Sequence, residues 1–260
     1  MNDRIIAIAN FLILAAVIIV NGMANALPIN GYTTGELSDM YPNLFVPAGI
    51  TFTIWGVIYL LMLVFVVFQL TEAFRRGSGS RIFHAIGYWF VVAGVANISW
   101  ILAWHYIHPV LSLVVMIVLL ASLTIIYIHL DYLKSDFRRA EKLFVLPCFS
   151  VYLGWITVAT IANTTAVLVH VGWKGGGIDH SFWTILMIAI ATIMGLYLIM
   201  KKNDWLFALV IIWALLGIFI KQNAAAELHR SIIVATIVGM VLNGIGIFVL
   251  LIGKFVRKPQ

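Results

Sequence analysis

The chain has 260 residues, of which 63% are hydrophobic and only 10% are charged. A soluble domain of this length needs far more charged surface, so the composition excludes that class and predicts a membrane protein with several spans. The apolar runs are continuous, whereas the strands of a membrane β-barrel alternate apolar and polar residues in segments of about ten. The spans are therefore predicted to be helices.

Eight segments are long and apolar enough to cross a bilayer, because a helix needs about 20 apolar residues to cross the ~30 Å hydrocarbon layer. We therefore predict an all-α integral membrane protein with eight transmembrane helices. A count of seven stays open, because the seventh segment is the shortest. The eight segments are residues 5–26, 45–71, 84–107, 109–130, 142–169, 181–200, 204–220 and 230–254.

The positive charges predict the orientation of these spans. With the N-terminus in the cytoplasm, only Lys174, Lys221 and Arg230 of the 16 Lys and Arg residues fall on the outer side. This distribution follows the positive-inside rule for a protein with both termini in the cytoplasm. We therefore expect the cell (inner) membrane, with the lipid bilayer and no nucleic acid as partner. The inner set is Arg4, Arg75, Arg76, Arg81, Lys134, Arg138, Arg139, Lys142, Lys201, Lys202, Lys254, Arg257 and Lys258.

The first span has an alternative interpretation. It combines a basic start, an apolar stretch and an A-x-A ending at Ala26, which is the outline of a cleavable signal peptide. Because the segment is long enough to span, we expect it to be retained, and cleavage is the alternative. The outer loop that follows, residues 27–44, is polar and unusually long, and we expect it to act as a lid.

The predicted membrane interior carries no Asp, Glu, Lys or Arg near the middle of a span. Ion-coupled pumps and proton relays place such groups inside, and catalysis needs a group that moves protons or attacks a substrate. We therefore expect a binding protein and not an enzyme, with no required cofactor. His105 and His108 share a turn, but two histidines without a third ligand favour interface residues over a metal site.

Aromatic and amide side chains recur at helical spacing on three of the spans. A buried amide without a partner costs several kcal/mol in hydrocarbon, so these amides must face protein, water or ligand. The pattern predicts a pocket with apolar walls and a few polar groups, suited to a flat, lipophilic ligand. Asn21 and Asn25 on the first span are interpreted instead as close-packing residues that form hydrogen bonds between helices. The three stripes are Phe52, Trp55 and Tyr59 on the second span, Asn97 and Trp100 on the third, and Tyr152, Trp155, Ala159 and Asn163 on the fifth.

Three motifs carry a family resemblance: PAGITFTIWGVIY, ANISW and YLGWITVATIAN. Their order and their helices resemble those of the TspO/MBR family, the translocator proteins or tryptophan-rich sensory proteins. The resemblance covers about residues 1–170 and implies a five-helix bundle that binds porphyrins and other hydrophobic ligands. It implies a pocket lined by Trp55, Asn97, Trp155 and Ala159. The predicted ligand site also includes the motif residues Tyr59, Trp100 and Asn163, for which packing is the alternative role.

We predict three parts along the chain. Residues 1–170 form the TspO-like ligand-binding bundle, residues 171–180 a Gly-rich linker, and residues 181–260 an accessory segment of three membrane helices. The accessory segment is expected to pack against the bundle or to form a homodimer interface.

The predicted function is to bind a planar hydrophobic small molecule, such as a tetrapyrrole, for sensing, sequestration or transfer. A facilitative transporter or channel for a small neutral or lipophilic solute is the alternative. A third hypothesis, an enzyme that modifies a porphyrin or a lipid, requires turnover that no motif of the sequence demands.

Overall fold

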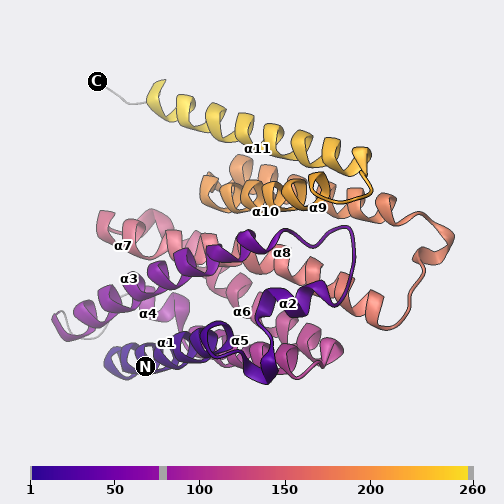
Figure 1. The fold of residues 1–260 in the computed structure, drawn as a ribbon. Helices are drawn as coiled ribbons and strands as arrows, with labels where there is room; N and C mark the ends of the chain where they lie inside the picture. The colour runs from indigo at the N-terminus through magenta and orange to yellow at the C-terminus, as the bar shows by residue number, and fades with distance from the viewer. Residues whose placement is uncertain (1, 76–80, 257–260) are drawn as a thin grey trace. The chain divides into compact units, whose positions relative to one another are not determined.

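A computed structural model of the protein describes residues 2–75 and 81–256, and the regular structure in these ranges is helical (Figure 1). Arg76, Arg257 and Lys258, which enter the charge distribution above, lie outside the described residues. The α-helices are α1 (Asp3–Ala26), α2 (Thr34–Asp39), α3 (Ile54–Arg75), α4 (Arg81–Ile86), α5 (Trp89–His105), α6 (Pro109–Leu133), α7 (Arg139–Phe144), α8 (Leu146–His170), α9 (His180–Lys202), α10 (Trp205–Asn223) and α11 (Arg230–Val256). The short 3-10 helices are η1 (Ile29–Gly31), η2 (Gly49–Thr53), η3 (Lys134–Asp136) and η4 (Gly175–Gly177).

Seven helical segments of the described chain are long and apolar enough to cross a membrane, which confirms the all-α membrane architecture. The predicted span over residues 84–107 is the one that differs. There the chain forms two helices, α4 and α5, that are separated at Gly87, whose φ of +52° favours glycine. Helix α5 has 17 residues and a length of about 25 Å, somewhat less than the ~30 Å hydrocarbon layer. The shortest predicted span, residues 204–220, is instead a full-length helix, α10.

The chain divides into two compact units. The first unit comprises Met1–Met40 and Thr53–Ile156, and the second comprises Tyr41–Phe52 and Thr157–Gln260. Helix α8 contributes its first turns to the first unit and its remaining turns to the second.

The first unit is a bundle in which α1 packs against α3 and α5, and α5 packs against α6. A triangle of phenylalanine rings joins three helices at its centre. The ring centroid of Phe65 on α3 lies 5.3 Å from that of Phe90 on α5 and 5.1 Å from that of Phe149 on α8. These edge-on contacts between fully buried rings fix the mutual positions of the helices that carry the candidate ligand site.

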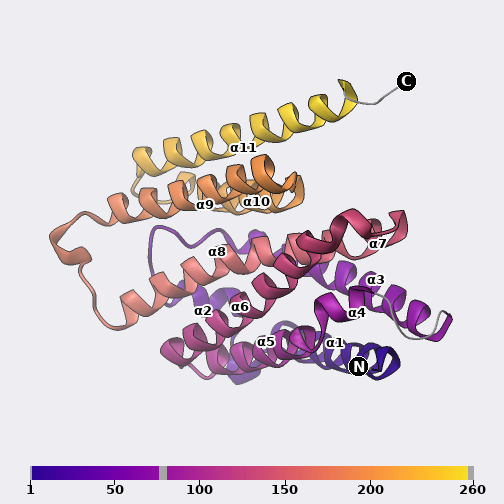
Figure 2. The same ribbon diagram turned by 180° about the vertical axis from the view of Figure 1, so that it is seen from behind.

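The second unit contains three long helices, α9, α10 and α11, each of which packs against the other two (Figures 1 and 2). Helix α9 ends at Lys202 and is followed by Asn203, which adopts the left-handed conformation with φ 56°. Asp204 then caps α10, because its carboxylate accepts hydrogen bonds from the backbone N–H groups of Leu206 and Phe207. Two residues are therefore enough to reverse the chain between these helices.

Close packing of α9 against α11 depends on Gly195. An alanine Cβ at this position would overlap the side-chain amide of Asn243 on α11. We expect Gly195→Ala to lower the free energy of unfolding by about 1–3 kcal/mol, the usual cost of overpacking. The matched control is Gly244→Ala on α11, where no atom lies within 4 Å of the added Cβ. This control should be neutral or stabilise by up to about 1 kcal/mol through helix propensity. Unfolding of the purified protein in detergent compares the two variants, and equal effects would contradict this packing.

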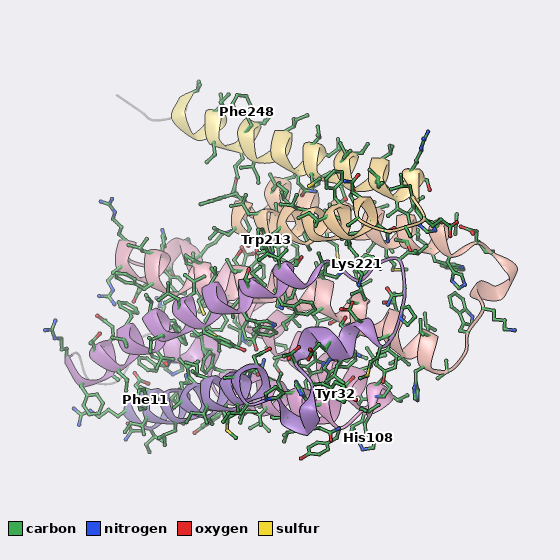
Figure 3. All side chains as sticks on the ribbon, viewed as in Figure 1. Phe11, Tyr32, His108, Trp213, Lys221 and Phe248 are labelled. Atoms are coloured by element: carbon green, nitrogen blue, oxygen red, sulfur yellow. The ribbon has the colours of Figure 1, made fainter. Side chains whose placement is uncertain are left out.

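Large apolar side chains remain exposed along the long helices, as a bilayer requires. Leu12 of α1, Ile193 of α9 and Phe248 of α11 are each more than 60% exposed, and Figure 3 shows Phe248 on the outer face of its helix. In the described part of the long helices, Asp, Glu, Lys and Arg occur only in the first or last turns. The middle turns of these helices can therefore lie in the hydrocarbon layer without placing a charged side chain there.

Candidate functional site

Trp55 is the centre of an aromatic cluster in the first unit. It stands at the start of α3, and its ring centroid lies 5.6 Å from that of Tyr59 and 6.4 Å from that of Trp100, both in stacked geometry. The rings of Tyr152 and Trp155 meet Trp55 edge-on at 6.0 and 6.3 Å. Three helices, α3, α5 and α8, thus place rings around one indole. We call these five residues the Trp55 cluster.

A chain of hydrogen bonds runs from α1 through α5 to Tyr152 of the Trp55 cluster. The Asn21 side-chain Nδ2 on α1 donates to Oδ1 of Asn97 at 2.7 Å. The Asn97 Nδ2 on α5 in turn donates to the hydroxyl of Tyr152 on α8 at 3.0 Å. Asn97 is fully buried, so its amide is engaged by protein groups on both sides. The phenol at the end of this chain accepts a hydrogen bond, and its own O–H has no acceptor among the described residues.

The cluster has a closed side and an open side. Trp100, Tyr152 and Trp155 are at most 6% exposed, whereas Trp55 and Tyr59 are only partly buried. A ligand that approaches the cluster would therefore meet Trp55 and Tyr59 first. The groups assembled here are indoles, phenols and amides, which can stack on a flat molecule and hydrogen-bond to it.

The structure thus brings together five of the seven predicted site residues: Trp55, Tyr59, Trp100 and Trp155 through their rings, and Asn97 through Tyr152. The other two, Ala159 and Asn163, follow Trp155 by one and two turns on α8 and belong to the second unit. Asn163 is buried and Ala159 is half-buried.

The segment that connects α1 to α2, together with the start of α2, is hydrogen-bonded to the end of α5. The ring of His105 is fully buried, with Nδ1 3.1 Å from the carbonyl oxygen of Ile29 and Nε2 3.2 Å from the hydroxyl of Thr34. Trp104, which stacks on Trp100, donates its indole N–H to the carbonyl oxygen of Thr34 at 3.3 Å. Both ring nitrogens of His105 are therefore engaged by the protein, and the segment expected to act as a lid contains two short helices, η1 and α2.

Helix α2 begins with a capping box. The backbone N–H and the hydroxyl of Thr33 donate to the Glu36 carboxylate, and these hydrogen bonds hold the pKa of Glu36 below its usual value. This contribution to α2 is present at neutral pH and is lost as the pH falls through the lowered pKa of Glu36.

The interhelical hydrogen bond of Asn21 agrees with the role expected for this residue from the sequence. Sequence reasoning missed two other features of the first unit. The first is the hydroxyl of Tyr152, singled out only as part of a stripe, which ends the hydrogen-bond chain. The second is a buried amide pair, in which Asn10 on α1 donates to Gln69 on α3 at 2.9 Å. The spacing of three between Tyr152 and Trp155 could have indicated the role of Tyr152. For the amides the only available signal was an amide within an apolar span.

Comparisons with known proteins place the chain in a family. A family model described as "TSPO-like protein" matches residues 7–249. The match confirms the resemblance and extends beyond residues 1–170 through α9, α10 and most of α11. Neither a search of curated proteins nor a search of solved structures gave a match.

Proposed function

The chain belongs to the family of TSPO-like proteins, and from this premise we propose that it binds a planar hydrophobic ligand of the porphyrin or tetrapyrrole kind within the membrane. Membership of the family supports ligand binding or sensing by a membrane protein in general. The choice of a flat ligand rests on the Trp55 cluster. Binding without turnover is the proposed role, in sensing, sequestration or transfer, and it needs no further cofactor.

The observation that carries this proposal is the position of Trp55 among four other aromatic rings from three helices. Offset-stacked and edge-on ring pairs are each worth about 0.5–1.5 kcal/mol beyond the apolar area that they bury. A porphyrin has a larger π face than any of these side chains, so it can replace several of the contacts at once. Trp55 and Trp155 would supply stacking faces, and Trp100 and Tyr59 would extend the wall.

The direct experiment is a titration of the full-length protein in detergent with protoporphyrin, followed by the shift of the porphyrin Soret band. We expect saturable binding that weakens in Trp55→Phe and Trp155→Phe. Trp89→Phe is the matched control, because Trp89 also lies on a helix of the first unit but its side chain is exposed. Saturable binding that is equally strong in all three variants would contradict the assignment of the site.

The hydroxyl of Tyr152 is the proposed donor to an oxygen atom of the ligand. Asn97 occupies its acceptor lone pair, which leaves the O–H free to point at a carboxylate or carbonyl group. We expect Tyr152→Phe to weaken protoporphyrin binding about 5- to 10-fold, the equivalent of one hydrogen bond of about 1–1.4 kcal/mol. Octaethylporphyrin, which has no oxygen, should lose little affinity.

The control for this prediction is Tyr88→Phe, which removes an exposed hydroxyl at the start of α5. If Tyr152→Phe weakens both porphyrins equally, the phenol acts through packing and not as a donor.

We further propose eight membrane crossings with both termini in the cytoplasm and the protein in the inner membrane. The charge distribution supports this arrangement, because α5 must cross for the basic residues after α6 to fall on the same side as Arg4. Helices α4 and α5 together cover residues 81–105, a length that allows such a crossing.

Ala159 and Asn163 continue the stripe of Trp155 on α8 and are proposed as additional ligand contacts. We also propose that the accessory helices α9–α11 form a homodimer interface.

A further inference from the structure

The segment Tyr41–Phe52, here called the strap, belongs to the same compact unit as residues 157–260, although it comes far earlier in the chain. The strap connects α2 to α3 and includes most of η2. What holds the strap in place is therefore found among the C-terminal helices.

Helix α10 binds the backbone of the strap at three points. The backbone N–H of Ala48 donates to the carbonyl oxygen of Gly217 at 3.0 Å. The indole N–H of Trp213, labelled in Figure 3, donates to the carbonyl oxygen of Thr51 at 2.9 Å. The side-chain amide of Gln222 donates to the carbonyl oxygen of Leu44 at 2.8 Å. In an apolar environment each of these backbone groups would be costly to leave unpaired.

Gly217 allows the strap to approach α10 closely. A Cβ on this residue would overlap the Thr51 side chain and would lie 2.9 Å from Cβ of Pro47. The hydroxyl of Thr51 is buried against this glycine without a hydrogen-bond partner in the described residues. The Thr51 side chain therefore packs against α10. It can lie this close only because residue 217 is a glycine.

The start of the strap is fixed by α8. Asn43 Oδ1 accepts hydrogen bonds from the backbone N–H groups of Phe45 and Val46, both at 3.0 Å. It also lies 3.3 Å from the hydroxyl of Thr165 on α8, whose proton is shared with the carbonyl oxygen of Ala162 at 2.8 Å. The ring of Tyr41 meets that of His170 edge-on at 6.1 Å. With α10 at its centre and end, the strap is anchored along most of its length.

The strap leads directly into the helix that carries the candidate ligand site. Thr51 precedes Trp55 by four residues, and η2 continues into α3 at Ile54. Four helical residues span about one turn, so Thr51 and Trp55 are close along the chain.

We propose that Trp213, Gly217 and Gln222 are positioning residues that hold the strap and, through it, Trp55. The C-terminal helices of this chain would then control the ligand site by way of the strap. The part of this inference that concerns affinity rests on the proposed function, whereas the part that concerns the strap and Trp55 does not.

The test uses Trp213→Phe, which removes one hydrogen bond and keeps an aromatic ring, and Gly217→Ala, which adds the overlapping Cβ. Trp205→Phe at the other end of α10 is the control for the loss of an indole. Three quantities are measured on the full-length protein: hydrogen exchange of peptides covering residues 44–52, the ¹⁹F resonance of 5-fluorotryptophan at position 55 without ligand, and the affinity for protoporphyrin.

We expect exchange of the strap to rise at least 10-fold in both test variants, with a shifted Trp55 resonance and an affinity lower by about 3- to 10-fold. Trp205→Phe should change none of these. Unchanged exchange in both test variants would overturn the anchoring by α10. Faster exchange with an unmoved Trp55 resonance would overturn the positioning of Trp55. If the wild type fails to bind protoporphyrin, the proposed function fails, and the exchange and the ligand-free resonance still decide the positioning role.

Discussion

Replacement of Trp55 by alanine is expected to weaken protoporphyrin binding about 30- to 100-fold. The substitution removes the indole that contacts the rings of Tyr59, Trp100, Tyr152 and Trp155. A stacking face of this size contributes about 2–3 kcal/mol through ring contact and apolar burial, which corresponds to that change in affinity. Because Trp55 is only partly buried, the fold should lose less stability than it would at Trp155.

The effect should depend on the ring and not simply on the loss of volume. Trp55→Phe keeps a smaller aromatic face and should cost about 3- to 10-fold. Trp89→Ala on α5 is the control for an exposed tryptophan and should leave affinity unchanged. A change below about 3-fold in Trp55→Ala would show that the cluster is not the binding site.

Replacement of Asn97 by leucine is expected to lower the free energy of unfolding by about 2 kcal/mol and to weaken ligand binding as well. The fully buried amide accepts from Asn21 and donates to Tyr152, so leucine breaks two hydrogen bonds between helices at once. One side-chain N–H of Asn21 would lose its partner, while the other keeps its bond to the carbonyl oxygen of Val17, so the cost is that of one unpaired buried donor. Unfolding in mixed detergent measures the loss.

A double-mutant cycle separates the hydrogen bond from the change in shape. Asn21→Leu leaves the side-chain oxygen of Asn97 without its donor. In the variant with both Asn21→Leu and Asn97→Leu, neither the donor nor the acceptor of this hydrogen bond is present, so neither is left unpaired. We therefore expect the double variant to lose less stability than the sum of the two single variants. Strict additivity would mean that the two amides are not coupled.

The Trp55 cluster could be predicted from the sequence because its members follow helical spacing. Tyr59 follows Trp55 by four residues, and Asn97 precedes Trp100 by three, so each pair shares a helix face. Amides and indoles also avoid lipid tails, which makes the inward direction predictable. The spacing did not reveal which atoms meet, and the phenol of Tyr152 was consequently left out of the predicted site.

Contacts between distant segments could not be predicted in this way. Asn21 and Asn97 are 76 residues apart, and Trp213 and Thr51 are 162 residues apart, so no local pattern links them. The break between α4 and α5 was also missed, because the apolar run continues through it and the cause is the backbone conformation of Gly87. Helical periodicity predicts which residues share one face of a helix. It does not predict which residues of another helix they contact, because those contacts depend on how the helices pack.

The most direct test of the central claim is ¹⁹F NMR of the protein labelled with 5-fluorotryptophan, titrated with protoporphyrin and assigned by single Trp→Phe variants. The ring current of a bound porphyrin shifts nearby fluorine resonances strongly. The account predicts saturable shifts at Trp55, Trp100 and Trp155, with Trp89 unmoved. Saturable binding that shifts other tryptophans and leaves these three unchanged would contradict it.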